Sequence, residues 1–304
     1  MTEREPFATS GGVETAIKEA ARKAAASDPS FDVSKRITLE HFNRFLSRVF
    51  SEGENSKWVL KGGTSILARI PSSRSTRDID LLCANFTLAR ALEELIRLAS
   101  TDLNDHFRFE YVNHRDSIGN DAHPYIEGYR VTFNVFIGLA PKGTLQVDLA
   151  VGAAMTDDVV TIAPATNLDL PRLTSNPYRL YPAVDQIADK VCATVTAYRE
   201  KASSREKDLV DLVVFAVTQD FDGTALRIAI ATELHRRKIV PIEHFTVPTA
   251  WGAGYARLNK SVSYCASYRT VELASDLVAR LIDPALTRDA DGKTWSHTSL
   301  DWAK

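Results

Sequence analysis

The chain has 304 residues, of which 44% are hydrophobic and 25% are charged, and its formal net charge is −2. This composition fits one large globular domain or two modest ones, and it excludes a protein that binds nucleic acid through strong overall basic charge, although local basic patches remain open. Three widely separated cysteines, no apolar run of the roughly 18 residues that a membrane helix needs, and no signal-peptide core favour a cytoplasmic protein without disulfides or membrane spans.

Helices and strands alternate over the first half of the chain. Apolar residues at helical spacing predict helices over residues 14–27, 38–50 and 88–100. Short buried strands are predicted at "KWVLKGG" and "DIDLLCA". The alternation of apolar and polar residues predicts three half-buried strands, in "FRFEYVN", "GYRVTFNVFI" and "GTLQVDLAV".

The pattern changes after about residue 160. The segment "IAPATNLDLPRLTSNPYRLYP" contains four prolines and is predicted to be a crossing linker. Helices are predicted beyond it, over residues 183–200, 205–220, 224–238 and 270–283. We therefore expect an α/β (α+β) fold, with a mixed-sheet domain and its N-terminal helices over residues 1–170 and a mainly helical domain over residues 171–304.

The stretch "KGGTS" (residues 61–65) follows a predicted strand and opens a predicted helix. Unpaired backbone N–H groups at a helix start, the helix dipole and the hydroxyls of Thr64 and Ser65 all favour a bound anion. Glycine at Gly62 and Gly63 would let the backbone approach a phosphate closely. A plain helix cap is the alternative explanation of this stretch.

Three aspartates are candidate metal ligands. Asp78 and Asp80 are two residues apart on a predicted strand, so they share one face while Ile79 points into the core. Asp148 lies within the apolar alternation of "GTLQVDLAV" and would complete a three-carboxylate cluster if the two strands are neighbours in the sheet. The alternatives are a salt bridge from Arg74 or Arg77 to the first two acids, and a solvent-facing position for Asp148.

Lys190 and the segment "REKDLVDL" form a further polar group in the helical region. Asp208 and Asp211 are three residues apart and share a helix face. Lys190 belongs to the preceding helix, which a short loop makes an antiparallel neighbour, so the lysine is expected to face a carboxylate and to point toward a phosphate. A structural ion pair between the helices is the alternative, and Arg205 could equally be an exposed charge.

These motifs together resemble the polymerase-β-type nucleotidyltransferase core, in the variant found in AbiEii/AbiGii-type (MenT-like) toxins. The family has four motifs in order, which here match Gly62-Gly63-Thr64-Ser65 with Arg69, then Asp78 and Asp80, then Lys190, then Arg205, Asp208 and Asp211. The resemblance covers roughly residues 57–215.

The resemblance implies a metal-dependent transfer of NMP from an NTP. Asp78, Asp80 and Asp148 would bind Mg²⁺ or Mn²⁺, with Asp148 at the attacking hydroxyl, and Lys190 would neutralise the triphosphate. Asp211 would position Lys190 or the nucleotide. The remaining nucleotide-binding candidates are Lys61, Gly62, Gly63, Thr64, Ser65, Arg69, Arg205 and Asp208.

The resemblance also implies an RNA acceptor, with the tRNA 3′ end first, and a cognate antitoxin as a protein partner. The basic clusters "YREKASSREK" and "HRRK" could contact phosphates, or could be solvated helix ends. A phosphate added at Ser75 or Thr76 would repel the triphosphate, which is a hypothesis for inhibition. A small-molecule nucleotidyltransferase and an inactive binding module are the competing interpretations, whereas a glycosyltransferase would leave "GGTS" unexplained.

Overall fold

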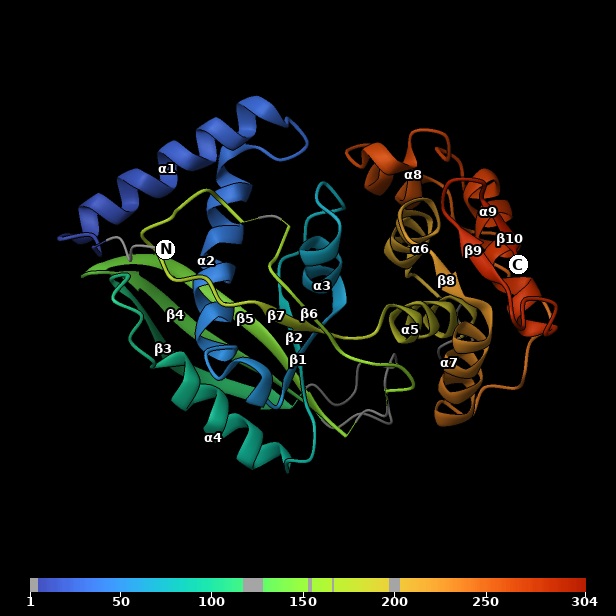
Figure 1. Ribbon diagram of the computed structural model, residues 1–304, viewed down its shortest axis with the longest axis horizontal. Helices are drawn as coiled ribbons and strands as arrows, with labels where there is room; N and C mark the ends of the chain where they lie inside the picture. The colour runs from blue at the N-terminus through green and yellow to red at the C-terminus, as the bar shows by residue number, and fades with distance from the viewer. Residues whose placement is uncertain (1–4, 117–127, 153–154, 166, 197–202) are drawn as a thin grey trace.

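The computed structural model describes residues 5–116, 128–152, 155–165, 167–196 and 203–304. A half built around a sheet lies beside a helical half (Figure 1). Helices α1 (Ser10–Ser27) and α2 (Val33–Val49) each begin at a capping residue, because the side chains of Thr9 and Asp32 accept hydrogen bonds from backbone N–H groups of the first turn. Both helices begin a few residues before the predicted positions.

In the described chain, seven strands form one mixed sheet in the order β3-β4-β5-β2-β1-β7-β6. They are β1 (Trp58–Lys61), β2 (Ile79–Cys83), β3 (Phe107–Asp116), β4 (Gly128–Ile137), β5 (Ala140–Val151), β6 (Val160–Ile162) and β7 (Tyr178–Leu180). Strand β2 runs antiparallel to β1 and parallel to β5, and the register puts Asp80 opposite both Lys61 and Asp148. The two predicted acidic strands are therefore neighbours.

The prediction of a plain linker after residue 160 is wrong in part. The proline-rich segment contributes β6 and β7, and β7 pairs in parallel with β1 while β6 pairs with β7. Both strands are only three residues long and lie near the edge of the sheet, where prolines between them do not interrupt a ladder. The sheet thus continues to Leu180, past the expected boundary at residue 170, and a division into two domains at that boundary stays a prediction.

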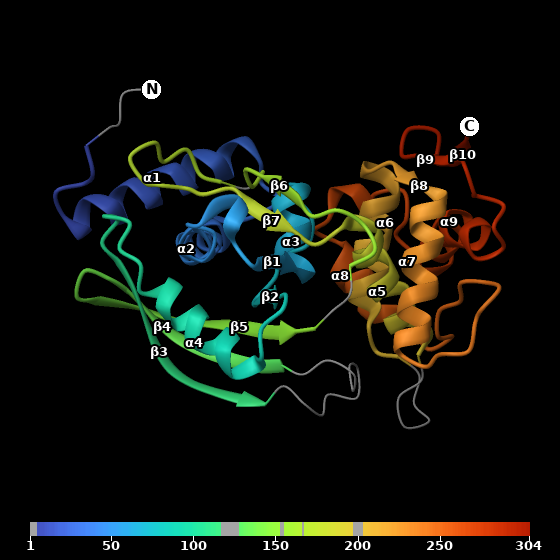
Figure 2. The ribbon, with the colours of Figure 1, turned by 60° about the horizontal axis from the view of Figure 1, so that its bottom comes forward.

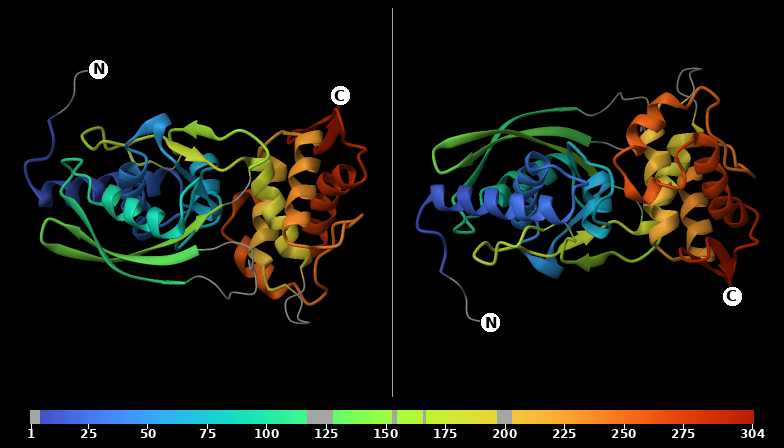
Figure 3. Two further views of the ribbon diagram at one scale, coloured as in Figure 1. Left: turned by 90° about the horizontal axis from the view of Figure 1, so that it is seen from below. Right: turned by 90° about the horizontal axis from the view of Figure 1, so that it is seen from above.

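Helices cover one face of the sheet. Side chains of α2 and α4 (Leu88–Ala99), such as Phe45 and Leu95, pack against strand residues that include Ile79, Phe133 and Val147. In the described chain the opposite face of β3, β4 and β5 carries no helix, as Figure 2 and the left view of Figure 3 show. The alternation along β5 accounts for this difference, since Leu145, Val147 and Leu149 are buried whereas Gln146 is exposed.

The second half of the chain is mainly helical, as predicted, and this confirms the expected fold class. Its helices are α5 (Ala183–Val195), α6 (Glu206–Thr218), α7 (Gly223–Arg236), α8 (Ala253–Asn259) and α9 (Val271–Leu286). A small sheet that was not predicted joins β8 (Phe221–Asp222), β9 (Thr294–Ser296) and β10 (Asp301–Ala303). In the described residues, no helix combines the length and the apolar character that crossing a bilayer requires.

The short helix α3 (Gly62–Arg69) belongs to both hydrophobic cores. Its Leu67 and Ala68 are buried in the core beneath the sheet, whereas its Ile66 and Ile70 are buried in the core of the helical half. The start of α3 therefore lies at the junction of the two halves.

Candidate active site

A cleft with a volume of about 320 Å³ lies between the two halves. The sheet half contributes Lys61, Gly62, Gly63, Arg74, Thr76, Asp78, Asp80, Leu81, Gly128, Arg130, Asp148, Leu149 and Ala150 to its lining, and the helical half contributes Gln186, Asp189, Lys190, Arg205, Lys207 and Asp208. The candidate residues that do not line the cleft are Thr64, Ser65, Arg69 and Asp211. The structure thus brings most of the predicted residues together, although they come from distant parts of the chain.

Asp80 lies at the centre of the acidic wall. Its pKa is raised from the ordinary value to about 6, first by burial and then by the negative charges of Asp78 and Asp148, while Lys207 and Lys61 act in the opposite direction. Within the described part of the chain Asp80 makes no ion pair. This carboxylate therefore carries negative charge that the protein only partly compensates.

Asp148 has a partner that the sequence did not reveal. Arg130, opposite it on β4, donates from Nε and Nη2 to the two carboxylate oxygens of Asp148 at 2.6 and 2.5 Å. The hydrogen bonding of Arg130 to Asp148, in which Arg130 donates, is the main reason why the pKa of Arg130 is raised. The alternating pattern puts Arg130 on a polar face, but the pairing depends on the register between two strands, which the pattern does not determine.

Two of the three carboxylates of the acidic wall fit a divalent cation. Carboxylate oxygens are the ligands that Mg²⁺ prefers, and the uncompensated charge at Asp80 beside Asp78 suits a cation. Asp148 differs because both its oxygens bind Arg130. Accordingly, no three His, Cys, Asp or Glu side chains in the described chain are grouped closely enough to hold a metal ion. Asp78 and Asp80 fit the cation, and a role for Asp148 as a third ligand stays a prediction.

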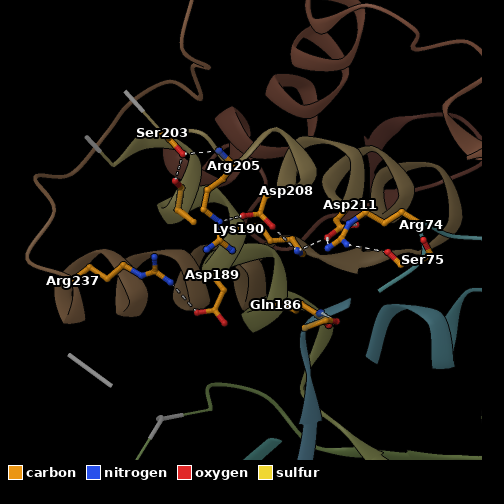
Figure 4. A network of polar contacts seen from close by, with 12 residues as sticks. Arg74, Ser75, Gln186, Asp189, Lys190, Ser203, Arg205, Asp208, Asp211 and Arg237 are labelled. Carbon is orange, nitrogen blue, oxygen red and sulfur yellow. Dashed lines mark hydrogen bonds and ion pairs between the residues drawn. The ribbon is translucent and has the colours of Figure 1, made fainter. Parts of the chain in front are cut away.

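Facing the acids, α5 and α6 carry a buried network of alternating charges (Figure 4). Lys190 Nζ lies 2.9 Å from Asp208 Oδ1 and 2.6 Å from Asp211 Oδ2, and Arg205 Nε lies 2.5 Å from Asp208 Oδ2. Burial alone would lower the pKa of Lys190, but the two carboxylates outweigh it and raise the pKa, so the lysine stays charged. Lys190 faces carboxylates across two packed helices, as the sequence predicted.

Arg74 extends this network into the sheet half. Its Nε and Nη2 donate to the two oxygens of Asp211, each at 2.8 Å, and Asp211 is fully buried. The considered salt bridge from Arg74 to Asp78 or Asp80 is therefore not formed; Arg74 lines the cleft while it holds Asp211. With Lys190, Arg205 and Lys207, it gives this wall of the cleft four cations, which alternate with the carboxylates of Asp189 and Asp208.

The loop around Arg74 contains the hydroxyl groups considered as phosphorylation sites. Ser75 is exposed, whereas the hydroxyl of Thr76 donates to the carboxylate of Asp78 at 3.1 Å. Phosphorylation at either residue stays a hypothesis, and the two side chains differ in how freely an enzyme could reach them.

The two glycines of "KGGTS" lie inside helix α3 and not before it. Gly62 also has a reason to be glycine that the sequence did not show. Helix α3 begins at Gly62 itself, and the hydroxyl of Thr64 donates to the backbone carbonyl of Asp78 at 2.9 Å, while Ser65 is buried beside Gln186. Gly62 has a positive φ of 63°, and a Cβ atom there would lie 1.8 Å from Oδ2 of Asp80. Glycine is thus required so that Asp80 can occupy its position.

Replacing Gly62 with alanine is expected to lower the nucleotidyl transfer that the motifs predict by about 100-fold, because the new methyl group displaces the Asp80 carboxylate. The backbone strain should also cost about 1 kcal/mol of unfolding free energy. Gly53→Ala is a matched control, since Gly53 also has a positive φ of 57° but no heavy atom within 4 Å of the added Cβ. Urea unfolding and transfer rates for both variants check this result; equal activity losses would show that strain, and not Asp80, is responsible.

The remaining predicted residues bind other parts of the protein. Arg69 Nη2 donates to the carbonyl of Tyr181 at 2.8 Å and so holds the start of α5. In the basic cluster "HRRK", Arg236 and Arg237 pair with Asp189 and Glu233. Much of the cluster "YREKASSREK" lies outside the described residues.

Comparisons with known proteins give a family for the chain and two similar solved structures. The family model described as "Nucleotidyl transferase AbiEii toxin, Type IV TA system" matches residues 44–291. The crystal structure of JHP933 from Helicobacter pylori is similar at 16% identity and a TM-score of 0.43, covering 84% of this chain and 94% of that one. A second solved H. pylori chain has 15% identity and a TM-score of 0.43, with 82% and 96% covered. No curated protein matches the chain.

Proposed function

The chain belongs to the AbiEii family of nucleotidyltransferase toxins, and we propose that it transfers NMP from an NTP to an RNA acceptor, with the 3′ end of tRNA as its target. Adding nucleotides at that end would block aminoacylation and stop growth. A cognate antitoxin would be its protein partner, since the family is that of a type IV toxin–antitoxin system. The enzyme would act in the cytoplasm, where NTPs and tRNA are present.

The observation that carries the proposal is one cleft in which Asp78 and Asp80 face a wall with four cations, Arg74, Lys190, Arg205 and Lys207, among which Asp189 and Asp208 are interspersed. A triphosphate needs cations along its length and, at the reacting phosphate, a metal ion held by carboxylates. Arg74, Lys190, Arg205 and Lys207 supply the first, and Asp78 and Asp80 supply the second. When bound there, Mg²⁺ or Mn²⁺ would neutralise charge on the triphosphate and polarise the phosphoryl group.

Side chains and backbone groups of the chain would bind the triphosphate and accept the proton of the attacking hydroxyl. Lys190, held extended by Asp208 and Asp211, would contact the triphosphate, with Lys61 and Arg205 beside it. The backbone at Gly62 and Gly63 would receive a phosphate at the start of α3, with Thr64, Ser65 and Arg69 supporting this segment. Asp148 would accept the proton of the attacking hydroxyl as pyrophosphate leaves.

Incubation of the purified protein with total tRNA, Mg²⁺ and each labelled NTP in turn tests the proposal. We expect label on tRNA with at least one nucleotide, and none with Asp80→Asn. The control variant is Asp291→Asn, which alters a carboxylate paired with Arg227 outside the cleft lining and should keep full activity.

A panel of aminoglycoside and nucleoside hydroxyl acceptors is run in parallel. Label on a small molecule with none on tRNA would replace the RNA acceptor by a small-molecule one. No label on any acceptor with any NTP would contradict transferase activity of the chain on its own.

A further inference from the structure

Asp148 is the residue of β5 that lies opposite Asp80 on β2. Its carboxylate is engaged in a salt bridge with Arg130. The two residues are partners across β4 and β5, and their side chains are 29% and 26% exposed. Both guanidinium contacts are short, at 2.6 and 2.5 Å, so the pair has the two-pronged geometry of a strong charge-assisted contact. A carboxylate with both oxygens engaged by a guanidinium is a weaker ligand for a cation than a free one.

The same guanidinium can be reached from outside the cleft. The burial pattern along β4 puts Arg130 on the side opposite the buried Val131 and Phe133. That side of β3, β4 and β5 carries no helix in the described chain (Figure 2). Its partner across β3 is Arg115, which is exposed and lies on the same face because directly opposite residues share a side of the sheet. Arg130 lines the cleft and Arg115 is its neighbour on β3, so the two cations together attract an anion. The position opposite Arg115 on β4 is Arg130 itself and offers no carboxylate.

A phosphate diester is an anion that suits this position. The planar fork of arginine matches carboxylate and phosphate equally well, so a phosphate can replace the carboxylate without loss of hydrogen-bond geometry. A phosphate between the two arginines could contact both Arg115 and Arg130, whereas Asp148 binds Arg130.

We propose that Arg130 guards Asp148, in the sense that it binds the Asp148 carboxylate while no acceptor is present. When the acceptor nucleic acid binds, Arg130 moves to one of its backbone phosphates, and this movement frees Asp148. This inference rests on the proposed function for its acceptor and adds a residue that couples acceptor binding to the reactive acid. Arg130 is a positioning residue in this scheme, because it acts through Asp148. The NTP alone would then meet an incomplete acidic wall, so transfer to water would be slow.

Cation binding without nucleotide or acceptor tests directly whether Arg130 keeps Asp148 from binding a cation. The probe is Mn²⁺, followed by the electron paramagnetic resonance signal of the free ion. Arg130→Gln is expected to bind Mn²⁺ about tenfold more tightly than the unmodified protein, and the double variant Arg130→Gln/Asp148→Asn should return to the original affinity. Arg227→Gln breaks a pair of similar exposure outside the cleft and should leave the affinity unchanged. Unchanged Mn²⁺ affinity in Arg130→Gln would overturn the proposal.

Acceptor choice tests the second half of the scheme. The ratio of kcat/KM for tRNA over that for adenosine, which has hydroxyls but no phosphate, is expected to fall about tenfold or more in Arg130→Gln. Arg130→Lys keeps the charge but loses the fork, so it should give an intermediate ratio, and it serves if the glutamine variant does not fold. A ratio that stays constant while Mn²⁺ binding tightens would overturn the link to the acceptor. If the unmodified protein labels neither acceptor, the proposed function fails, whereas the Mn²⁺ result still decides whether Arg130 guards Asp148.

Discussion

Replacing Asp80 with asparagine is expected to abolish nucleotidyl transfer and at the same time to stabilise the folded protein at neutral pH. Transfer should fall about 1,000-fold or more, equivalent to ~4 kcal/mol of transition-state stabilisation, because the cation proposed at the reacting phosphate would lose a ligand. A loss of activity together with a gain in stability is typical of a residue retained for its chemistry.

The gain in stability follows from the raised pKa of Asp80, which is about 6 in the folded protein against an ordinary value of 3.8. Between these two pH values the folded state binds more protons than the unfolded state, so the contribution of Asp80 to stability is lost as the pH rises through 6. At pH 7 the ionised carboxylate therefore destabilises the fold, by about 1–2 kcal/mol after allowance for partial exposure. The asparagine variant is free of this cost.

Urea unfolding of both proteins at pH 7.5 and pH 4.5 checks this expectation. The advantage of Asp80→Asn should be present at pH 7.5 and should shrink at pH 4.5, where Asp80 of the unmodified protein is protonated in the folded state. Asp148→Asn is the contrasting variant, since it removes the partner of Arg130 and should give no gain. If the Asp80→Asn variant were less stable than the unmodified protein at pH 7.5, the negative charge of Asp80 would have to be compensated in the folded protein, which contradicts this expectation.

Replacing Asp211 with asparagine is expected to cause the largest loss of stability among the cleft variants, about 3–5 kcal/mol of unfolding free energy. Asp211 is fully buried and accepts hydrogen bonds from Lys190 and from Nε and Nη2 of Arg74. Without the charge of Asp211, Arg74 loses the carboxylate that it binds, and Lys190 keeps only its contact with Asp208 in the described chain. Transfer should fall as well, because both cations line the proposed triphosphate site.

Urea unfolding at pH 7.5 measures the loss. Asp291→Asn removes a carboxylate that is 36% exposed and bonded to Arg227 at 2.7 Å, and is expected to cost less than about 1 kcal/mol. The double variant Arg74→Met/Asp211→Asn removes one of the stranded cations and should recover part of the stability. A loss below 1 kcal/mol in Asp211→Asn would show that the charge of Asp211 does not hold the network together.

The parts of the structure that the sequence predicted are those set by local periodicity. Alternation in "GTLQVDLAV" correctly separated Gln146 and Asp148 from the buried Leu145 and Val147, and helical spacing put Asp208 and Asp211 on one face. These patterns depend only on neighbouring residues, because side chains repeat every two positions in a strand and every 3.6 in a helix.

The parts that were missed depend on distant residues. Strand β7 has three residues after a proline-rich stretch and forms because β1 offers it an edge, which no local pattern reveals. Arg130 and Arg74 are likewise ordinary arginines in the sequence. Their roles come from the register of β4 on β5 and from the approach of a loop to α6, both of which are tertiary contacts.

The packing of helix α3 against both cores determines when, during synthesis, the chain can become active. The start of α3 is made early, yet Ile66 and Ile70 find their packing partners only in the helical core, and the cationic residues Lys190 and Arg205 follow more than a hundred positions later. A growing chain therefore has no complete cleft until α6 has left the ribosome and packed against α5 and α3. The order of residues along the chain delays the appearance of activity until more than two thirds of the protein exists.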